Sequence, residues 1–250
     1  MDFDAVVIAV SIGMIPHTCS ELLEASPRWR AMVDAVSTVP TQSLQLWFRR
    51  TEQELGWPHP GATVSGYASP FDTYASMSHL IPRESWPAES RPRSIAYFCS
   101  ALPEEASHDP DIAHKLVRGN AADLLSRRVG HFWPAAAAPD GGFSWDVLHA
   151  TAPVGDENRA GDESLLDSQY WRANIDPSDR YVQSVPGSLA FRLRADESGY
   201  HNLFLAGDWI NNGHNGGCIE AAVISGMQAA NAVRGRRLTK GIRGDYPLKP

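Results

Sequence analysis

The chain has 250 residues, of which 43% are hydrophobic, and its formal net charge at pH 7 is −7. This composition allows a substantial buried core and excludes a chain that is disordered throughout. The acidic balance and the lack of a long Lys/Arg run argue against nucleic acid or an anionic membrane surface as the main partner.

Other general features point to a cytoplasmic protein. No segment has the apolar length needed to span a bilayer, and the chain starts at Met1-Asp2 without a charged-then-apolar leader. The three cysteines, Cys19, Cys99 and Cys218, are far apart, with no C-x-x-C and no His at metal-ligand spacing. We therefore expect neither a disulfide framework nor a metal site.

The first predicted elements are a strand and a helix. Residues 4–10 form a continuous β-branched and apolar run, which is typical of a central strand in a parallel sheet. Ser26-Pro27 then begins a helix, because proline is tolerated at the first helical position. One face of this helix carries Trp29, Met32, Val33 and Val36.

The middle of the chain predicts an antiparallel sheet with one or two helices. Residues 43–48 alternate as a half-buried strand with Leu44, Leu46 and Phe48 inward, and residues 61–68, 93–101 and 143–148 are further predicted strands. Asp109-Pro110 caps a helix, and residues 152–167 predict a loop or lid. The stripe that this helix is expected to bury consists of Ile112, Ala113, Leu116, Val117, Leu124 and Leu125.

The most informative segment lies near the end of the chain, where a short strand leads into a glycine-rich turn and a helix. Residues 203–206 are all apolar and too few for a helix, which favours a strand covered on both faces, with Gly207 allowing a sharp exit. Gly216 and Gly217 then open the helix. Its apolar stripe is Ile219, Val223, Met227, Ala230 and Val233, and its thin face, suited to close packing on a sheet, is Ala222, Ser225, Gly226 and Ala229.

This arrangement predicts that one carboxylate and one helix N-terminus face the same ligand. Asp208 stands at the carboxyl end of the strand, where open α/β sheets bind ligands. The two glycines would let a planar ring approach the backbone, and the helix N-terminus favours negative charge on that ring, as on the edge of a reduced flavin. The structural alternative is a core strand followed by a tightly packed core helix, with Glu220 complementing the helix dipole.

The same segment resembles the C-terminal signature of the flavin-dependent amine oxidase and phytoene-desaturase-like superfamily. The resemblance covers residues 169–234, including the runs 169–174 and 180–188, and residues 4–10 look like the strand that leads back out of the family's flavin domain. It implies FAD as the cofactor, with Asp208 on the ribityl chain and the start of the helix at the pyrimidine edge. The implied FAD contacts are Gly207, Asp208, Trp209, Gly216, Gly217, Cys218 and Ile219.

One part of the family pattern is missing from these 250 residues. No G-x-G-x-x-G follows a strand, and the clusters Gly141-Gly142 and Gly213 to Gly217 have neither the spacing nor the context of that motif. Because this motif holds the pyrophosphate of FAD, we expect a second chain to carry the G-x-G-x-x-G half of the flavin domain.

The sequence assigns no catalytic residue. Flavin amine oxidases and desaturases remove a hydride, and the protein mainly positions the C–H bond over the flavin in a dry site. His214 is either a neighbour of the ring or a hydrogen-bonding residue of the loop. Seven aromatic residues are candidates for the wall of a substrate pocket, and the alternative is that they belong to the core or an interface. They are Trp47, Tyr67, Tyr74, Trp145, Tyr170, Trp171 and Tyr181.

The predicted fold is α/β, or α+β overall, with a Rossmann-like FAD-binding remnant formed by both ends of the chain. The predicted boundaries are residues 1–38 for a flavin-domain strand and helices, 39–168 for an inserted substrate-binding domain with an antiparallel sheet and helices, and 169–250 for the returning flavin-domain segment. The predicted function is the C-terminal part of an FAD-dependent oxidoreductase acting on an amine or an unsaturated or isoprenoid substrate. The alternative is an incomplete fragment or partner subunit that only completes a flavin site on another chain.

Overall fold

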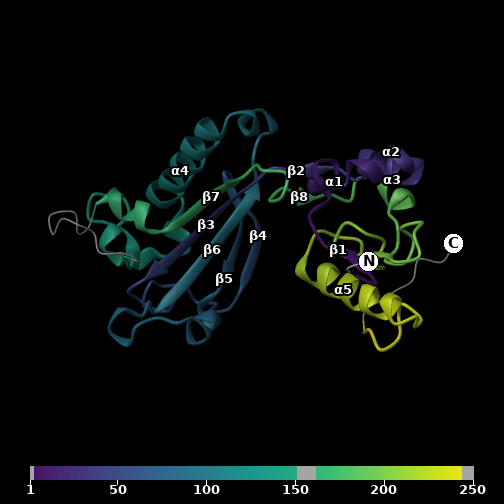
Figure 1. Ribbon diagram of the computed structural model, residues 1–250. Coiled ribbons are helices and arrows are strands. Elements are labelled where there is room, and N and C mark those ends of the chain that lie inside the picture. Colours follow the sequence, from purple (N-terminus) through teal and green to yellow (C-terminus); the bar gives the residue numbers. More distant parts are fainter. Residues whose placement is uncertain (1–2, 151–161, 244–250) are drawn as a thin grey trace. The chain divides into compact units, whose positions relative to one another are not determined.

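The computed structural model describes residues 3–150 and 162–243 of the chain (Figure 1). The chain divides into two compact units, each mixing helices and strands. Unit 1 contains Met1–Pro40 and Ile175–Pro250, and unit 2 contains Thr41–Asn174. The sequence predicted divisions at 38/39 and 168/169, and the second of these differs from the division between the compact units by six residues.

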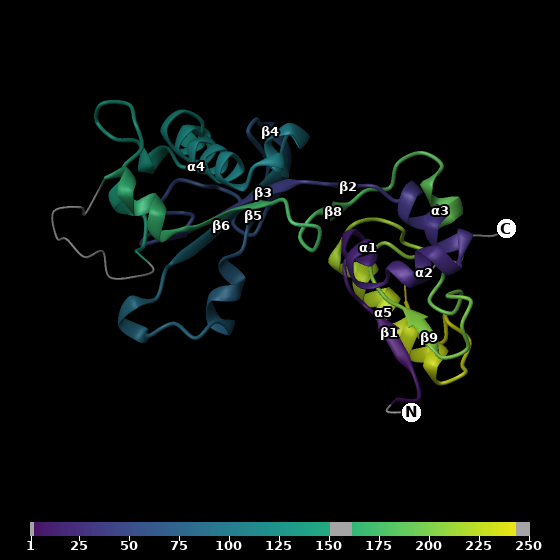
Figure 2. The ribbon, with the colours of Figure 1, turned by 45° about the horizontal axis from the view of Figure 1, so that its top comes forward.

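Unit 1 contains two small sheets made from both ends of the chain. β1 (Val6–Ile8) and β9 (Leu203–Leu205) are parallel and pair from Val6↔Leu203 to Ile8↔Leu205 (Figure 2). β2 (Thr38–Val39) and β8 (Tyr181–Val182) are antiparallel. The strands predicted at 4–10 and 203–206 are therefore present, although each is shorter than its apolar run.

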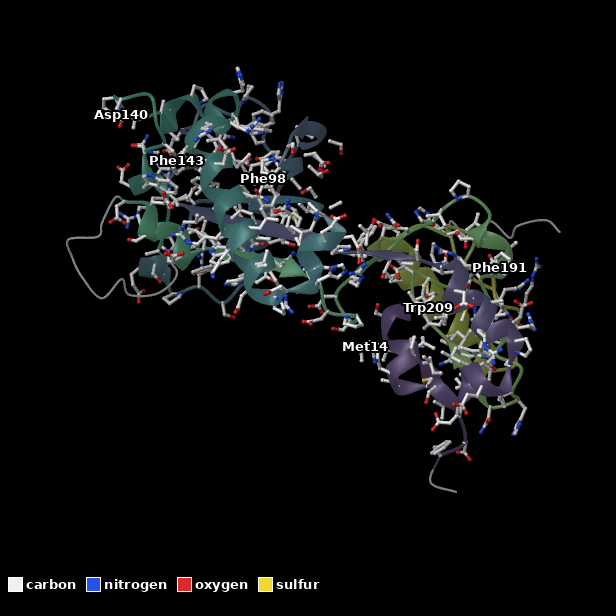
Figure 3. All side chains as sticks on the ribbon, turned by 90° about the horizontal axis from the view of Figure 1, so that it is seen from above. Met14, Phe98, Asp140, Phe143, Phe191 and Trp209 are labelled. Atoms are coloured by element: carbon white, nitrogen blue, oxygen red, sulfur yellow. The ribbon has the colours of Figure 1, made fainter. Side chains whose placement is uncertain are left out.

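The helices of unit 1 pack around these strands. They are α1 (Ile15–Thr18), α2 (Ser20–Ala25), α3 (Pro27–Ala35) and α5 (Ile219–Val233). The predicted start of α3 at Pro27 is confirmed, and its Trp29 and Met32 are buried in one core cluster with Ile8 and Leu205. Trp209 belongs to the same cluster and lies among the elements of unit 1 in Figure 3. This core joins segments that are more than 160 residues apart in sequence, because Trp29 Nε1 donates to Ser198 O at 2.8 Å.

Unit 2 is built on a five-stranded antiparallel sheet with the order β4-β5-β6-β3-β7. In β3, Leu44, Leu46 and Phe48 are buried as predicted, because side chains two residues apart share one face of a strand. β7, which the prediction assigned to the returning flavin-domain segment, pairs with β3 in this sheet. The strands are β3 (Thr41–Phe48), β4 (Thr63–Ala68), β5 (Phe71–Ser76), β6 (Ser94–Ala101) and β7 (Tyr170–Asn174).

The helix α4 (Pro110–Arg127) packs against this sheet. Its predicted cap is confirmed, since the Asp109 carboxylate accepts hydrogen bonds from Asp111 N at 2.9 Å and Ile112 N at 3.2 Å. Asn120 donates to Gln42 Oε1 at 2.9 Å, which places α4 on the face of β3 that Leu44 and Leu46 share. Phe98 lies in the core beneath the helix together with Phe48, Phe71, Tyr74, Phe132 and Trp133 (Figure 3).

Several predictions for unit 2 are wrong. Residues 143–148 contain a 3-10 helix, Trp145–Val147, rather than a strand, and Ser144 Oγ donates to Asp146 Oδ1 at 2.8 Å, a local bond that competes with strand pairing. The strand β5 was not predicted, because it buries Phe71, Tyr74 and Ser76 without a regular alternation. In α4, Ile112 is exposed, and Ala121 takes part in the buried stripe instead. Of the predicted loop at 152–167, residues 163–167 belong to the 3-10 helix Glu163–Ser168, and residues 152–161 lie outside the described residues.

The helix α5 is present as predicted, but it turns a different face to the core. Its buried residues are Ala221, Ile224, Ser225, Gln228 and Ala229. Of the predicted thin face, Ser225 and Ala229 are buried, whereas Ala222 and Gly226 are exposed. The whole apolar stripe, Ile219, Val223, Met227, Ala230 and Val233, is exposed.

Candidate functional site

The strand β9 is followed by a turn that carries the Asp208 carboxylate. Gly207 has a φ of +144°, and a Cβ atom there would lie 2.2 Å from Trp209 Nε1, so the turn requires glycine. The Gly207 amide donates to Ser225 Oγ of α5 at 2.7 Å. Trp209 is buried, and its indole donates to Val10 O at 3.0 Å beyond the end of β1. Gly207 and Trp209 thus fix the turn, and the side chain of Asp208 between them is half-buried.

The Asp208 carboxylate is half-buried and short of partners. Burial raises its pKa above the ordinary value, while its own backbone amide and the positive charge of Arg192 act in the opposite direction. Within residues 3–150 and 162–243, no other side chain is hydrogen-bonded to this carboxylate. A half-buried carboxylate in this state can accept hydrogen bonds from the hydroxyl groups of a ligand.

Arg192 organises the backbone behind Asp208. Its guanidinium is buried and donates through Nη1 to Asp208 O at 2.9 Å, and through Nη2 to Gln183 O and Ser184 Oγ, each at 3.0 Å. Ser184 Oγ in turn donates to Asn215 O in the loop before α5. One buried cation therefore connects the strand end, the 183–184 segment and the glycine-rich loop.

The loop at 211–217 is fixed to α5 by a buried amide. Asn212 Oδ1 accepts hydrogen bonds from the backbone amides of His214 at 3.0 Å and Asn215 at 2.8 Å. Asn212 Nδ2 donates to Ala221 O at 3.2 Å, and Gln228 Nε2 donates to Asn212 O at 3.1 Å. Asn215 adopts a left-handed conformation with a φ of 58°. These bonds hold the start of α5 in one place relative to Asp208.

The two glycines before α5 differ in their surroundings. A Cβ on Gly217 would lie 2.7 Å from both Val182 O and the Tyr181 ring, so this glycine allows β8 to pack closely. A Cβ on Gly216 would meet only the His214 ring, at 3.6 Å. Cys218 is the N-cap residue of α5, and its side chain makes no capping hydrogen bond to the backbone.

The first turn of α5 is exposed in part, and its Ala221 is buried. Ile219 and Glu220 are both exposed. The pKa of Glu220 is lowered, first by a hydrogen bond from its own backbone amide and next by one from Cys218. An anion is thus already favoured at this helix N-terminus, as the helix dipole requires. A ligand atom with partial negative charge would meet the same field.

The structure therefore links the backbone of Asp208 to the loop before α5 through Arg192 and Ser184, and it gives three of the predicted residues structural contacts. Gly207, Trp209 and Gly217 are needed for the turn, the core and β8, as described above. Sequence reasoning missed Arg192, Asn212, Asn215 and Gln228. The run Asn211-Asn212-Gly213-His214-Asn215-Gly216-Gly217 signalled a turn, whereas nothing local distinguishes Arg192 from the other arginines.

The aromatic residues considered for a substrate pocket are dispersed over different environments. Tyr74 is buried in the core of unit 2, where its hydroxyl donates to Glu52 Oε1 at 3.3 Å. The rings of Trp171 and His114 lie in a tilted contact with centroids 4.3 Å apart, and the ring of Tyr181 lies against Gly217. Trp47, Trp145 and Tyr170 lie in unit 2, and the side chain of Tyr67 is outside the described part.

The described residues give no indication of a metal centre or a transmembrane helix. In the ranges 3–150 and 162–243, no group of three His, Cys, Asp or Glu side chains is arranged to hold a metal ion. In the same part of the chain, every helix is too short or too polar to cross a bilayer.

Comparisons with known proteins identify a family and a fold. The family model described as flavin containing amine oxidoreductase matches residues 1–234. A search of curated proteins found no match. Among solved structures, an oxidoreductase from Methanosarcina mazei superimposes with a TM-score of 0.56 at 12% identity, over 92% of this chain and 43% of that chain. The present chain thus spans less than half the length of that structural neighbour.

Proposed function

Because the chain belongs to the flavin-containing amine oxidoreductase family, we propose that unit 1 holds the ribityl chain and ring edge of FAD within an FAD-dependent oxidoreductase. The cofactor follows from the family, which contains flavin. The observation that carries the proposal is the Asp208 carboxylate, half-buried at the end of a parallel strand and without another side chain bound to it among the described residues.

The groups present at the site fit such a cofactor. Asp208 would accept hydrogen bonds from ribityl hydroxyls, and the exposed first turn of α5 would direct its backbone amides at the pyrimidine edge of the ring. Bound FAD would supply the hydride-accepting chemistry. Arg192 and Asn212 would keep the carboxylate and the helix start in position, so that the negative charge of the reduced ring meets the positive end of the helix.

Membership of the family also supports proposals for the fold of unit 1, the role of unit 2 and the substrate. β1, β9 and α5 would form part of a Rossmann-like flavin domain, with the rest supplied by a polypeptide carrying the G-x-G-x-x-G motif that these 250 residues lack. Unit 2, with its own sheet and core, would be the substrate-binding domain. The substrate would be an amine or an unsaturated or isoprenoid compound, and we place the protein in the cytoplasm.

A second candidate function is a partner subunit that completes a flavin site on another chain without catalysing a reaction itself. Both candidates share the Asp208 carboxylate at the end of β9 and differ in whether the assembled protein oxidises a substrate. Measuring both flavin content and substrate oxidation in the assembled protein distinguishes the enzyme from the non-catalytic subunit, because only the enzyme must oxidise a substrate.

The experiment begins with the colour of the purified 250-residue chain. We expect it to be colourless, because the pyrophosphate of FAD would lack its glycine-rich turn. In protein assembled with a G-x-G-x-x-G half, Asp208→Ala should lose most of its FAD, while the exposed control Asp196→Ala should retain it. Stoichiometric FAD on the chain alone would overturn the half-site proposal, and full occupancy in Asp208→Ala would remove Asp208 from the site.

A further inference from the structure

The segment 77–93, which joins β5 to β6, lies on the face of the unit 2 sheet opposite to α4. It contains the 3-10 helices Ser78–Arg83 and Ala88–Ser90, the first of which packs against β6. Trp47 of β3 and Ile95 of β6 are paired, and the alternation of side chains along the strands places both on this face. Ile95 is only 1% exposed. Figure 2 shows the segment, in blue, on the side of the strands away from α4, so it covers part of that face.

The segment is bonded to the sheet differently at its ends and in its middle. At the ends, Met77 N donates to the backbone of β6 at 3.0 Å and Arg93 N donates to the backbone of β3 at 2.8 Å. Residues 79–92 between them make one hydrogen bond to the rest of the described chain, which joins the Ser90 backbone to the ring of His149. The middle of the segment therefore depends on side-chain contacts for its position.

The main contact of the middle is made by Trp86. Its ring meets the rings of Trp47 and His149 edge-on, with centroids 6.0 and 5.8 Å apart. Trp47 and His149 are cross-strand neighbours, since His149 N donates to Trp47 O at 2.7 Å and the adjacent bridge Phe48↔Leu148 is antiparallel. Their side chains consequently project on the same side, and Trp86 packs on both.

Two polar atoms of this aromatic cluster are buried without a hydrogen-bond partner in the described chain, Trp47 Nε1 and His149 Nε2. Because Nε2 has no partner, the bond to the Ser90 backbone is made by Nδ1 of His149, which donates to the carbonyl. Neutral His149 then keeps a lone pair on Nε2. A second proton would add a charge and a buried N–H without an acceptor, in a cluster whose other unpartnered group, the Trp47 indole N–H, is also a donor.

The groups around His149 act on its protonation in the same sense. Burial is the main cause that lowers the pKa of His149, the bond to Ser90 acts in the opposite direction, and the positive charge of Arg49 adds to the lowering. Glu84 in the segment accepts from Trp86 Nε1 at 2.6 Å. The other titratable or charged residues on the elements packed around His149 are all exposed, and they are His79, Arg83, Glu89 and Arg91 in the segment, Asp146 before His149, and Glu163 and Asp167, which pair with Arg118.

We propose that the 77–93 segment is a pH-sensitive strap, which lies on the sheet while His149 is neutral and is released in its middle when His149 takes up a proton. Release would expose Trp47 and Ile95, while the backbone bonds of Met77 and Arg93 would keep both ends of the strap in place.

The direction of the pH dependence follows from linkage. A histidine that is exposed after release has a pKa of about 6.5, whereas the pKa of His149 under the strap is lower. The released form therefore binds more protons below about pH 6.5, and acid favours release. Between pH 8 and pH 7 both forms are mostly neutral, so the strap stays on the sheet.

The test is hydrogen–deuterium exchange of the full 250-residue chain, followed by mass spectrometry at pH 8 and pH 5 and corrected for intrinsic exchange rates. We expect the protection of residues 79–92 to fall at pH 5 by about tenfold for each unit that separates the two pKa values of His149. The protection of β3 and α4 should not change. In His149→Phe, which keeps a ring against Trp86 but cannot titrate, the protection of 79–92 should be the same at both pH values.

His79→Gln is the matched control, because His79 is an exposed histidine in the same segment, and this variant should keep the pH dependence of the parent chain. Equal protection of 79–92 at both pH values in the parent chain would overturn the proposal. So would a pH dependence that persists in His149→Phe or disappears in His79→Gln, or a loss of protection that extends to β3 and β6. If His149→Phe does not fold, an NMR titration of His149 in the parent chain decides: a pKa below about 6.5 supports the strap, and a pKa at or above it refutes the strap. These measurements need no flavin, so their outcome is independent of the proposed FAD site.

Discussion

At the scale of single residues, Asp208, which we propose as a ligand-binding residue, carries a cost to stability. Its pKa is raised by burial, whereas an unfolded Asp has a pKa of about 3.9. Between these two values the folded chain binds more protons than the unfolded chain, so stability falls as the pH rises through this window. Below about pH 4 the carboxyl is protonated in both states and this contribution disappears.

We therefore predict that Asp208→Asn raises the melting temperature of the isolated chain at pH 7 and reduces its decline between pH 4 and pH 7. The amide keeps the shape of the carboxyl without the buried charge. Thermal denaturation monitored by circular dichroism at several pH values would measure this, with the exposed Asp196→Asn as the control. A lower melting temperature for Asp208→Asn at pH 7 would show that the charge has a stabilising partner.

Arg192 donates hydrogen bonds to two backbone carbonyls behind Asp208, those of Asp208 and Gln183. Replacing it with Met would leave Asp208 O and Gln183 O without their buried donor, at a cost of about 3 kcal/mol in the free energy of unfolding. Arg194→Met, two residues away and exposed, should change it by less than about 0.5 kcal/mol. Urea denaturation of both variants would measure the difference. Equal stability of Arg192→Met and the parent chain would mean that these carbonyls find other donors.

At the scale of elements, the junction between the glycine-rich loop and α5 depends on one of its two glycines. Gly217→Ala places a Cβ against Val182 O and the Tyr181 ring, and should destabilise the chain by about 1–3 kcal/mol. Gly216→Ala meets only ordinary contact with His214 and should be nearly neutral. Denaturation midpoints of the two variants would distinguish them.

Measuring FAD content as well as stability in Gly216→Ala and Gly217→Ala distinguishes a role in ligand binding from a role in packing. In the assembled protein, a flavin ring close to the backbone at Gly216 would make Gly216→Ala lose FAD without losing stability. If Gly216→Ala binds FAD normally, the ring does not approach the chain at this residue. A stable Gly217→Ala variant would instead contradict the close packing of β8.

At the scale of the whole molecule, the two units differ in how they depend on chain connectivity. Unit 2 is one continuous segment, Thr41–Asn174, whereas unit 1 needs two segments to bring Trp29 and Ile8 against Leu205. We predict that residues 41–174 expressed alone unfold cooperatively, with a near-ultraviolet circular dichroism signal from the packed aromatic cluster around Tyr74 and Phe98.

The matched fragment is residues 175–250, which contain β9 and α5 but lack β1 and α3. It should show no cooperative transition, because six of the fifteen buried residues in the core cluster, among them Trp29 and Ile8, lie outside the fragment. A cooperative fragment 175–250, or a fragment 41–174 without fixed aromatic packing, would contradict this division of the chain.

Local patterns in the sequence were sufficient to predict the order and type of many helices and strands. They were also sufficient to identify the family. Pro27 and Asp109 marked helix starts, the alternation in 43–48 gave the inward side of β3, and the segment from Leu203 to Val233 gave the strand, turn and helix together with the resemblance to flavin amine oxidases. These features depend on neighbouring residues, whose backbone preferences and periodicity are visible in the sequence.

Only the tertiary structure decided how those elements are used. It placed β7 in the sheet of unit 2, put Arg192 behind Asp208, set Gly217 against β8 and turned the apolar stripe of α5 outward. Each of these depends on contacts between segments distant in sequence, and a periodic pattern shows that a helix has an apolar face without showing what covers it. In α5 the polar atoms of Ser225 and Gln228 bond to Gly207 and Asn212, and these bonds hold the opposite face against the core.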